Sequence, residues 1–384
     1  MEEKHFDVII CGAGPSGSTC ALALADSGLK VAVIEKNSFP REKVCGDAIA
    51  AYVPKVLNTI NPKYREAALN FLEKVPVNTC RLIMPNGKHI DVEGTEYGFT
   101  SQRIQWDNFL YELTTKEENI HHFLNHEIKD VTIHKEKGEV SVIANNILFK
   151  AKVVVGCDGA HSVVNKKTVG TKPDLNHYSG AVRAYYNNVT GIPENTIELH
   201  FIDSILPGYF WIFPIKGNKA NVGIGALSAE VSKKKMNLKA MLDDTIKNHP
   251  IIKERFKDAT IIGKIEGFGL PLSSRKVQMT GDHFILCGDA ASLIDPASGE
   301  GIGQAMASGR YAGWQIKKCF KENDFSAKCM KQYDTWIYDK FWRTSQKSHF
   351  FQKYFFTRKW LLNFCGNIIT RSKLLQRLAM KLAT

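Results

Sequence analysis

The fold is decided by residues 6–17, FDVIICGAGPSG. The apolar, β-branched run at 6–11 is typical of a buried parallel strand, and it stops directly at glycine. We expect a helix over 15–27 and a second strand over 30–36, KVAVIEK. Together these segments form a right-handed βαβ unit with a glycine-rich turn at the end of its first strand.

The spacing of the glycines predicts that this turn binds a dinucleotide. Gly12 permits a tight turn, Gly14 lets a pyrophosphate approach the backbone, and Gly17 allows close packing of helix and strand. Glu35 follows Gly17 by 18 residues and ends the second strand, where a carboxylate can accept hydrogen bonds from ribose hydroxyls. The residues expected at a dinucleotide are Gly12, Ala13, Gly14, Pro15, Ser16, Gly17, Glu35 and Lys36.

Two further segments turn a general dinucleotide signal into a specific one. Cys157-Asp158-Gly159 ends the buried run at 151–157, and Gly288-Asp289 follows the strand at 284–287. Residues 296–303, PASGEGIG, then open a helix whose free N–H groups can stabilise negative charge on a reduced isoalloxazine. Three such segments predict FAD held along its length, contacted in the second and third segments by Asp158, Gly159, Gly288, Asp289, Pro296, Gly299, Gly301 and Ile302.

The order of the predicted elements indicates a discontinuous domain. A hairpin is expected at 80–100, β-rich sequence at 179–225 and a helical insert at 229–258. We predict an α/β fold (α+β overall), in which an antiparallel-sheet substrate domain is inserted into a Rossmann-like FAD-binding domain. The predicted boundaries are 1–78, 101–175 and 276–320 for the FAD-binding domain, 79–100 and 176–275 for the substrate domain, and 321–384 for a helical C-terminal region.

Composition restricts the compartment and the chemistry. The segment at 1–7 is polar rather than a signal peptide, and no apolar run reaches the roughly 18 residues of a membrane span. Nine cysteines lie scattered without a C-x-x-C pair. We therefore expect a cytoplasmic protein with neither a disulfide framework nor a metal site.

Positive charge is concentrated at the C-terminus. Residues 331–384 carry 11 Lys and Arg and 2 Asp and Glu, a net +9 of the chain's +12. Twelve aromatic residues fall between Tyr333 and Phe364. One hypothesis is peripheral binding to the anionic inner face of the cytoplasmic membrane, and the other is helices packed on the body with a solvated basic face. We expect no nucleic-acid partner, because no recognised module accompanies the charge. Helical spacing extends this basic, apolar pattern to Leu374, Leu375, Leu378 and Leu382.

The three cofactor segments together resemble the p-hydroxybenzoate-hydroxylase-type flavoproteins. Within that superfamily, 41–47 (REKVCGD) and 209–214 (YFWIFP) resemble the geranylgeranyl reductase family, whose pattern is Y-x-W-x-F-P. The resemblance covers roughly residues 5–315. It implies that Arg41 and Arg103 contact the cofactor and that Cys45 and Gly46 pass near the flavin ring. Two departures stand out, namely Asn165 where an Arg is usual and Asp47 where several relatives have Gly.

The aromatic strand defines the predicted substrate side. Tyr209, Trp211 and Phe213 alternate onto one face and are expected to bind an apolar or flat substrate, although a plain core strand has the same pattern. The reaction implied by the family is hydride transfer from flavin N5 to an isolated C=C bond, with a proton added to the other carbon. Cys45 is the first candidate for the catalytic proton donor and Tyr209 the second, while Cys45 is otherwise a small residue packed against the ring.

Three functions follow from these observations. The first is an FAD-dependent reductase of isoprenoid double bonds in a prenyl lipid or prenylquinone. The second is a flavin monooxygenase or halogenase, since 208–214 partly matches the halogenase pattern G-W-x-W-x-I-P. The third is a non-enzymatic prenyl-binding escort protein. Without a second dinucleotide fingerprint, the electron donor is either NADPH or ferredoxin, and the oligomeric state stays open.

Overall fold

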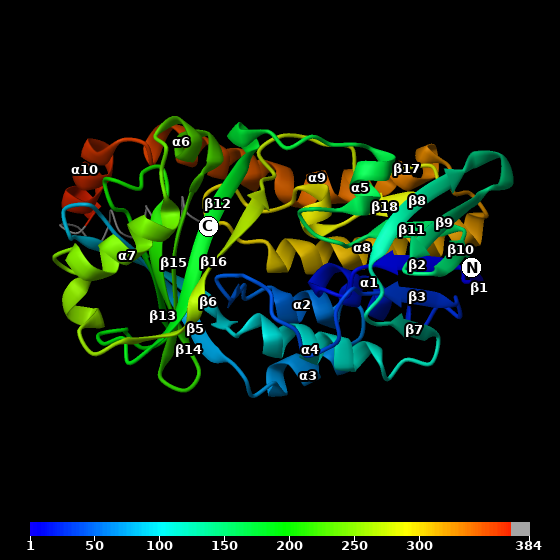
Figure 1. The fold of residues 1–384 in the computed structure, drawn as a ribbon, viewed down its shortest axis with the longest axis horizontal. Helices are drawn as coiled ribbons and strands as arrows, with labels where there is room; N and C mark the ends of the chain where they lie inside the picture. The colour runs from blue at the N-terminus through cyan, green and yellow to red at the C-terminus, as the bar shows by residue number, and fades with distance from the viewer. Residues whose placement is uncertain (370–384) are drawn as a thin grey trace.

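The computed structural model describes residues 1–369. Its two larger sheets lie toward opposite ends of the long axis, and the helices α8 (Ile302–Glu322) and α9 (Ala327–Phe350) lie along the molecule (Figure 1). The leucine pattern predicted at 374–382 lies outside the described residues.

The FDVIICGAGPSG stretch forms the centre of a six-stranded sheet. The expected strand is β2 (Val8–Cys11), and its neighbours β3 (Val31–Ile34) and β11 (Val153–Gly156) pair with it in parallel. All residues of these three strands are buried, as the continuous apolar runs predict. In order across the sheet, the strands are β17 (Thr280–Gly281), β18 (Phe284–Leu286), β11 (Val153–Gly156), β2 (Val8–Cys11), β3 (Val31–Ile34) and β7 (Ile120–Phe123).

Two helices cover this sheet and meet through glycines. A Cβ atom at Gly309 of α8 would lie 2.1 Å from the Ser16 carbonyl oxygen of α1 (Pro15–Leu24), and one at Gly313 would lie 2.5 Å from Ala23. The missing side chains therefore allow α8 to lie directly on the helix that begins at the glycine turn. The remaining helices of this half are α2 (Val53–Asn58), α3 (Pro62–Asn70), α4 (Arg103–Thr114) and α5 (Val163–Thr168), with 3₁₀ turns at Lys135–Lys137, Leu175–His177 and Gly288–Ala291.

A four-stranded sheet is an element that the sequence analysis did not predict. Its order is β1 (Glu2–His5), β10 (Ile147–Ala151), β9 (Glu139–Ala144) and β8 (Ile128–His134). The polar segment at the N-terminus pairs in parallel with β10. A strand at the edge of a sheet tolerates polar residues, so this segment carries little sequence signal.

The second large sheet has eight strands and is mixed rather than purely antiparallel, because β13 and β5 pair in parallel. Strand β5 begins at Val75, four residues before the predicted boundary at 79, so the residues at 75–78 belong to this sheet. The order is β16 (Thr260–Pro271), β12 (Tyr178–Asn187), β15 (Lys219–Leu227), β14 (Tyr209–Ile215), β13 (Thr196–His200), β5 (Val75–Ile83), β6 (His89–Thr100) and β4 (Ala48–Ile49).

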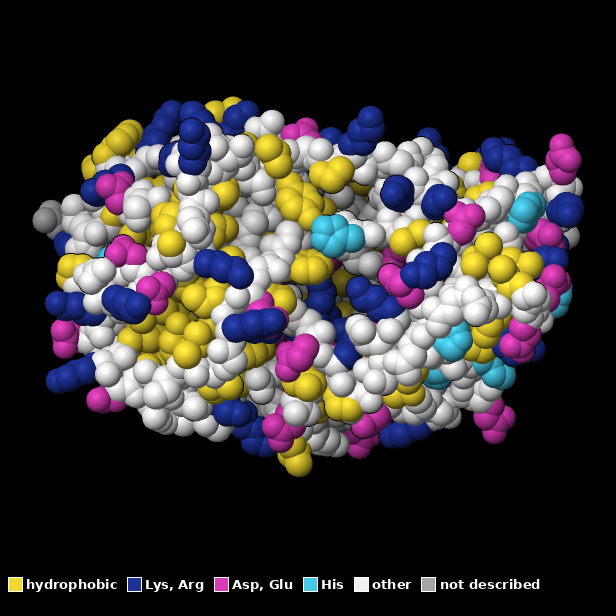
Figure 2. Space-filling model, in the orientation of Figure 1, with side chains coloured by type: hydrophobic (Ala, Val, Ile, Leu, Met, Phe, Trp, Pro, Cys, Tyr) yellow, Lys and Arg dark blue, Asp and Glu magenta, His cyan; other side chains and the backbone are white. Residues whose placement is uncertain are grey.

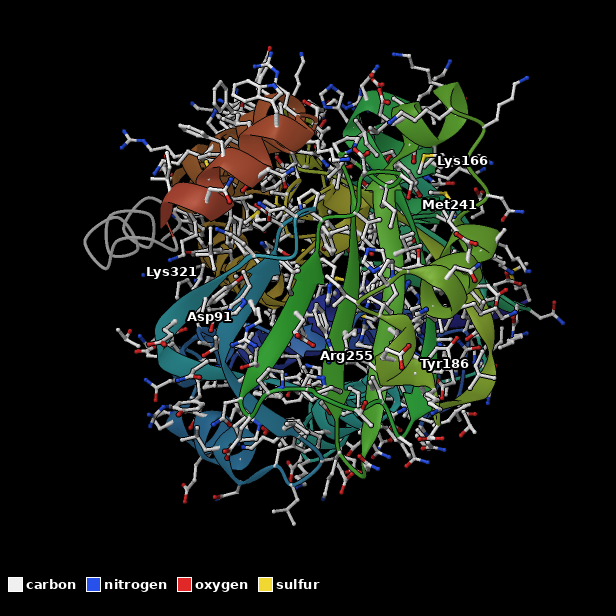
Figure 3. All side chains as sticks on the ribbon, turned by 90° about the vertical axis from the view of Figure 1, so that its left-hand side faces the viewer. Asp91, Lys166, Tyr186, Met241, Arg255 and Lys321 are labelled. Atoms are coloured by element: carbon white, nitrogen blue, oxygen red, sulfur yellow. The ribbon has the colours of Figure 1, made fainter. Side chains whose placement is uncertain are left out.

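The two faces of this sheet have different surroundings. On one face, helices α6 (Ser228–Lys233) and α7 (Leu238–Asn248) and the 3₁₀ turn at Lys253–Phe256 cover a small core. Figure 3 looks at the molecule from this end and labels Tyr186, Met241 and Arg255 among these elements. The other face contributes Ala181, Trp211 and Phe213 to the wall of a cavity. This sheet therefore separates a structural core from the candidate site.

The start of the C-terminal region packs on the body. Met330, Tyr333 and Ile337 of α9 are buried in the main core, and the Tyr333 hydroxyl donates to the Leu286 carbonyl at 2.8 Å. A π-helical turn at Phe351–Phe355 and helix α10 (Lys359–Ile369) follow. Within residues 1–369, none of the helices combines the length and the hydropathy that crossing a membrane requires.

Candidate active site

The candidate site is a cavity of about 910 Å³, lined by both large sheets. It receives residues from all three predicted cofactor segments and from the aromatic strand β14. Figure 2 shows the surface hollowed near the middle of the molecule, with Lys and Arg side chains around the opening. Its volume falls at the upper end of the range for ligand pockets, about 300–1,000 Å³.

The glycine turn packs closely on neighbouring backbone and lines the cavity. A Cβ atom at Gly17 would lie 1.8 Å from the Gly12 carbonyl oxygen, and one at Gly12 would lie 2.4 Å from the Cys157 carbonyl oxygen. Gly14 is the N-cap of α1, and no side chain of the described residues caps that helix. The cavity is lined here by Gly12, Gly14, Pro15 and Ser16. Uncapped N–H groups at a helix N-terminus favour an anion, so this turn fits a pyrophosphate.

Glu35 lies where the sequence predicts it and supports the turn. One of its oxygens accepts the Ala13 N–H at 3.1 Å, and the other accepts the Asn37 N–H at 3.1 Å. Glu35 is buried, and both it and Lys36 line the cavity. Its carboxylate therefore links the glycine turn to the end of β3 beside the space available for a ribose.

Two arginines named by the family resemblance meet at one carboxylate. Arg103 donates to both oxygens of Asp107, at 2.6 and 2.7 Å, and Arg41 lies 3.0 Å from Asp107. Asp107 is fully buried, and the Arg41 Nε atom lies 3.7 Å from Glu35 without a hydrogen-bond partner in the part of the chain that the structure describes. Asp107 was not among the residues predicted from the sequence, although its i,i+4 spacing from Arg103 on a helix is a usable signal.

The second cofactor segment is joined to the third by Asn165. Asp158 lines the cavity, but its carboxylate accepts from Ser162 Oγ at 2.5 Å and from the Val163 N–H at 2.7 Å, at the start of α5. Asn165 lies where the family resemblance led us to expect an Arg, and its amide donates to the Ala290 carbonyl at 2.7 Å. It therefore holds together the segments at 157–159 and 288–291. Gly159 and Asp289 also line the cavity, whereas Gly288 is buried and is not among the lining residues.

Lys43 and Asp289 are oppositely charged groups within the site. Burial raises the pKa of Asp289, and the charge of Lys43 opposes this shift. Burial lowers the pKa of Lys43 to about 8, and its amine lies 3.0 Å from the centre of the Phe268 ring. Lys43 was not among the residues predicted from the sequence, because nothing in its local pattern indicates burial.

The loop before α8 is fixed by an aspartate and touches the aromatic strand. Asp295 accepts the N–H groups of Ala297 and Ser298 at 3.0 and 2.9 Å. The Tyr209 hydroxyl donates to the Ser298 carbonyl, and burial raises its pKa. Gly299 has φ of +70°, a conformation that favours glycine. Pro296, Gly299, Gly301 and Ile302 line the cavity, and no side chain of the described residues caps α8.

Three aromatic side chains of β14 lie in a row along the cavity and form its aromatic wall. Ring centres of Tyr209 and Trp211 are 6.1 Å apart, as are those of Trp211 and Phe213, and all three residues line the cavity. Gly46 passes beside this wall, since a Cβ atom there would lie 3.4 Å from Phe213. The wall is also the inner face of the eight-stranded sheet, so it serves packing and the cavity together.

Cys45 lies between the wall and the arginines. Burial raises the pKa of its thiol, and the positive charge of Arg103 opposes this effect. The Asp47 N–H donates to Cys45 Sγ at 3.3 Å. A thiol with a raised pKa keeps its proton at neutral pH, which is the state that a proton donor needs.

Two family models match segments of the chain that form this cavity. The family model for the geranylgeranyl reductase catalytic domain matches residues 178–268, and that for FAD dependent oxidoreductases matches 7–168. A digeranylgeranylglycerophospholipid reductase of Methanococcus vannielii is 31% identical over 344 residues, covering 87% of this chain and 82% of the relative. One from Thermoplasma acidophilum is 32% identical, covering 88% and 85%. The chain belongs to the geranylgeranyl reductase family.

Solved structures agree with this family assignment. The crystal structure of a geranylgeranyl bacteriochlorophyll reductase-like protein from Thermoplasma acidophilum has a TM-score of 0.83 and 26% identity, over 98% of this chain and 96% of that one. The flavin-dependent brominase Bmp2 has a TM-score of 0.80 at 20% identity, over 99% and 93%, and shares the fold. This geranylgeranyl reductase-family chain is an FAD-dependent oxidoreductase, which confirms the predicted fold class, enzyme class and cofactor.

Proposed function

We propose that this enzyme saturates isolated C=C bonds in the isoprenoid chains of a membrane lipid. The observation that carries the proposal is one cavity that joins a dinucleotide-type groove to an aromatic wall, with a cysteine between them. The relatives named above are reductases of digeranylgeranylglycerophospholipid, and we extend that substrate class to this chain. Burying a prenyl chain against apolar side chains contributes roughly 0.8 kcal/mol per methylene.

Some residues of the cavity fit the cofactor and the prenyl chain, and another supplies the proton. Bound FAD, when reduced, supplies the hydride equivalent. The glycine turn, Glu35 and the paired arginines fit its phosphates and ribose, and Trp211 and Phe213 provide an apolar surface that excludes water. Cys45 is our candidate donor of the proton, because burial favours its protonated thiol. Tyr209 is only the second candidate for the proton donor, because its hydroxyl proton is already engaged in a hydrogen bond to the Ser298 carbonyl.

Anaerobic turnover tests this function. Purified enzyme carrying FAD is reduced with dithionite without oxygen and mixed with digeranylgeranylglycerophospholipid in detergent micelles. Mass spectrometry is expected to show products heavier by two hydrogens for each bond reduced. Cys45→Ala should lower the rate about 10²–10⁴-fold, the usual contribution of a positioned acid, and leave FAD affinity unchanged. A requirement for oxygen, with an oxygen or halogen atom added, would instead support the monooxygenase or halogenase hypothesis.

We further propose that the C-terminal face contacts an anionic membrane surface beside the cavity. Trp360 is 64% exposed and Phe364 55% exposed, although Leu362 between them is fully buried against the body. Gln352 lines the cavity and donates to the Pro296 carbonyl at 2.7 Å, so the π-helical turn adjoins the loop before α8. Apolar and basic side chains gather at the upper left of Figure 2, where α10 lies. Exposed aromatic side chains with nearby Lys and Arg are typical of interfacial binding.

A further inference from the structure

A chain of buried polar groups links the aromatic wall to the loop that carries Cys45. The Trp211 indole N–H donates to Asn221 Oδ1 at 2.9 Å. The Asn221 Nδ2 group donates to Asp47 Oδ2 at 2.8 Å and to the Cys45 carbonyl at 2.7 Å. An indole nitrogen can only donate and a carboxylate can only accept, so the amide has one orientation that satisfies all three contacts.

Asp47 ends this series of hydrogen bonds, although its backbone conformation and its burial are both unfavourable. Its φ is +69°, in the left-handed region that residues with a Cβ atom avoid, and it is fully buried. The Tyr185 hydroxyl donates to Oδ2 at 2.7 Å, while Oδ1 has no hydrogen-bond partner among residues 1–369. Glycine would relieve the backbone and remove the buried charge. A carboxylate at this position therefore suggests a role that glycine cannot fill.

The Trp211 indole packs against glycines, whose missing side chains leave room for the ring. A Cβ atom at Gly223 would lie 2.2 Å from Cζ2 of Trp211, and one at Gly225 would lie 3.7 Å from Cζ3. On the other side, a Cβ atom at Gly46 would lie 3.9 Å from the indole. The ring is thus held between β15 and the loop at 45–47. Among the described polar groups, only Asn221 accepts a hydrogen bond from the indole N–H and so fixes the rotation of the ring.

We propose that Asn221, anchored by Asp47, is a positioning residue that fixes the Trp211 indole beside Cys45 and thereby determines which double bond of a prenyl chain reaches the reacting position. The proposal deepens the reductase function and depends on it. Asn221 acts through Trp211 and the Cys45 carbonyl and does not itself react. A shift of the wall of about 1 Å relative to the proton donor is enough to cost on the order of a hundredfold in rate.

A double-mutant cycle tests this coupling. Asn221→Leu and Trp211→Phe are each expected to lower kcat/KM by about ten- to a hundredfold and to change the ratio of partly to fully reduced products. The double variant should be no slower than the slower single variant, since both changes break the same contact. Asn218→Gly, at an exposed left-handed position in the neighbouring turn, is the control and should behave as the native enzyme. Multiplying effects, or an unchanged product ratio, would overturn the proposal.

Near-ultraviolet circular dichroism provides a readout independent of turnover. Asn221→Leu should change the tryptophan signal of the FAD-loaded protein, and this change should vanish in the Trp211→Phe background. Asn221→Ser repeats the measurement if the leucine variant does not fold. A further outcome is a spectral change that depends on Trp211 as expected while prenyl lipids are not reduced. That result would contradict the reductase proposal and still support the positioning of the indole by Asn221. A spectral change that persists without Trp211 would contradict the positioning role itself.

Discussion

Single buried charges determine much of the chemistry of the cavity. Asp107 holds Arg103 and Arg41, Asp289 faces Lys43, and Asp47 accepts two hydrogen bonds on one oxygen. The family resemblance pointed to Arg41 and Arg103 and the third cofactor segment pointed to Asp289, but none of these signals named the partners of these side chains. Asp47 and Asn221 are 174 positions apart in the chain, so no local pattern can reveal that they share a hydrogen bond.

Asp47 also makes stability depend on pH. Burial raises its pKa from 3.8 to about 6, so folding favours the protonated carboxyl. Stability from this group is fully present below pH 3.8 and is lost as the pH rises through about 6. Asp47→Asn does not titrate. From pH 4 to pH 7.5 the native protein should lose up to roughly 3 kcal/mol relative to this variant, at 1.36 kcal/mol per pKa unit.

Urea unfolding of both proteins at a series of pH values measures this difference. Glu266→Gln controls for the general effect of pH, because Glu266 is partly exposed in an ion pair with Arg183. A difference between the native protein and Asp47→Asn that stays constant from pH 4 to 7.5 would show that the Asp47 carboxyl does not titrate in this range.

At the scale of elements, periodicity and glycine spacing predicted the βαβ unit, the hairpin and the helical insert. They did not predict the four-stranded sheet, whose first strand is polar, or the parallel pairing of β13 with β5. Pairing direction depends on where the chain returns, which the local pattern of apolar residues does not encode. The contact of α8 with α1 likewise depends on small residues that meet only after folding.

The contact between α1 and α8 predicts a cost for one added methyl group. Gly309→Ala gains about 1 kcal/mol of helix propensity but places a Cβ atom against the Ser16 carbonyl. We expect a net loss of about 1–3 kcal/mol in the free energy of unfolding, which is typical of overpacking. FAD affinity should also weaken, because Ser16 belongs to the glycine turn.

Denaturant unfolding and fluorescence titration with FAD measure these two effects. Gly180→Ala is the matched control, because a Cβ atom there meets its nearest neighbour at an ordinary 3.7 Å. If Gly309→Ala is as stable as the native protein and binds FAD equally well, the close contact of the two helices does not support the cofactor turn.

For the molecule as a whole, the C-terminal region packs on the body at its start, as one of the two hypotheses expects, and contact with a membrane surface stays a proposal. The first half of α9 packs on the body, whereas the π-helical turn and α10 expose aromatic side chains near the cavity. A deletion after residue 345 would remove the Leu362 and Gln352 contacts as well as the surface. Point variants are therefore the sharper test of membrane binding.

Replacing the exposed aromatic residues of α10 should weaken vesicle binding. Trp360→Ser with Phe364→Ser is expected to reduce sedimentation with phosphatidylglycerol vesicles by at least about tenfold, which corresponds to 1.4 kcal/mol of lost transfer free energy. Ile261→Ser removes an exposed apolar residue from β16, at the opposite edge of the sheet, and should have no effect. Equal losses in both variants, or none in either, would contradict a membrane-binding face at α10.

The sequence by itself determined the cofactor and the family. Each cofactor segment is a short strand followed by glycines, and the required backbone conformations are encoded by neighbouring residues. Only the tertiary structure decided how the cavity is assembled: which carboxylate holds the arginines, how Asn165 joins the second cofactor segment to the third, and how Asn221 joins Trp211 to the loop at 45–47. These contacts join residues far apart in the chain, and hydrogen-bond geometry and burial arise only when the sheets and helices pack together.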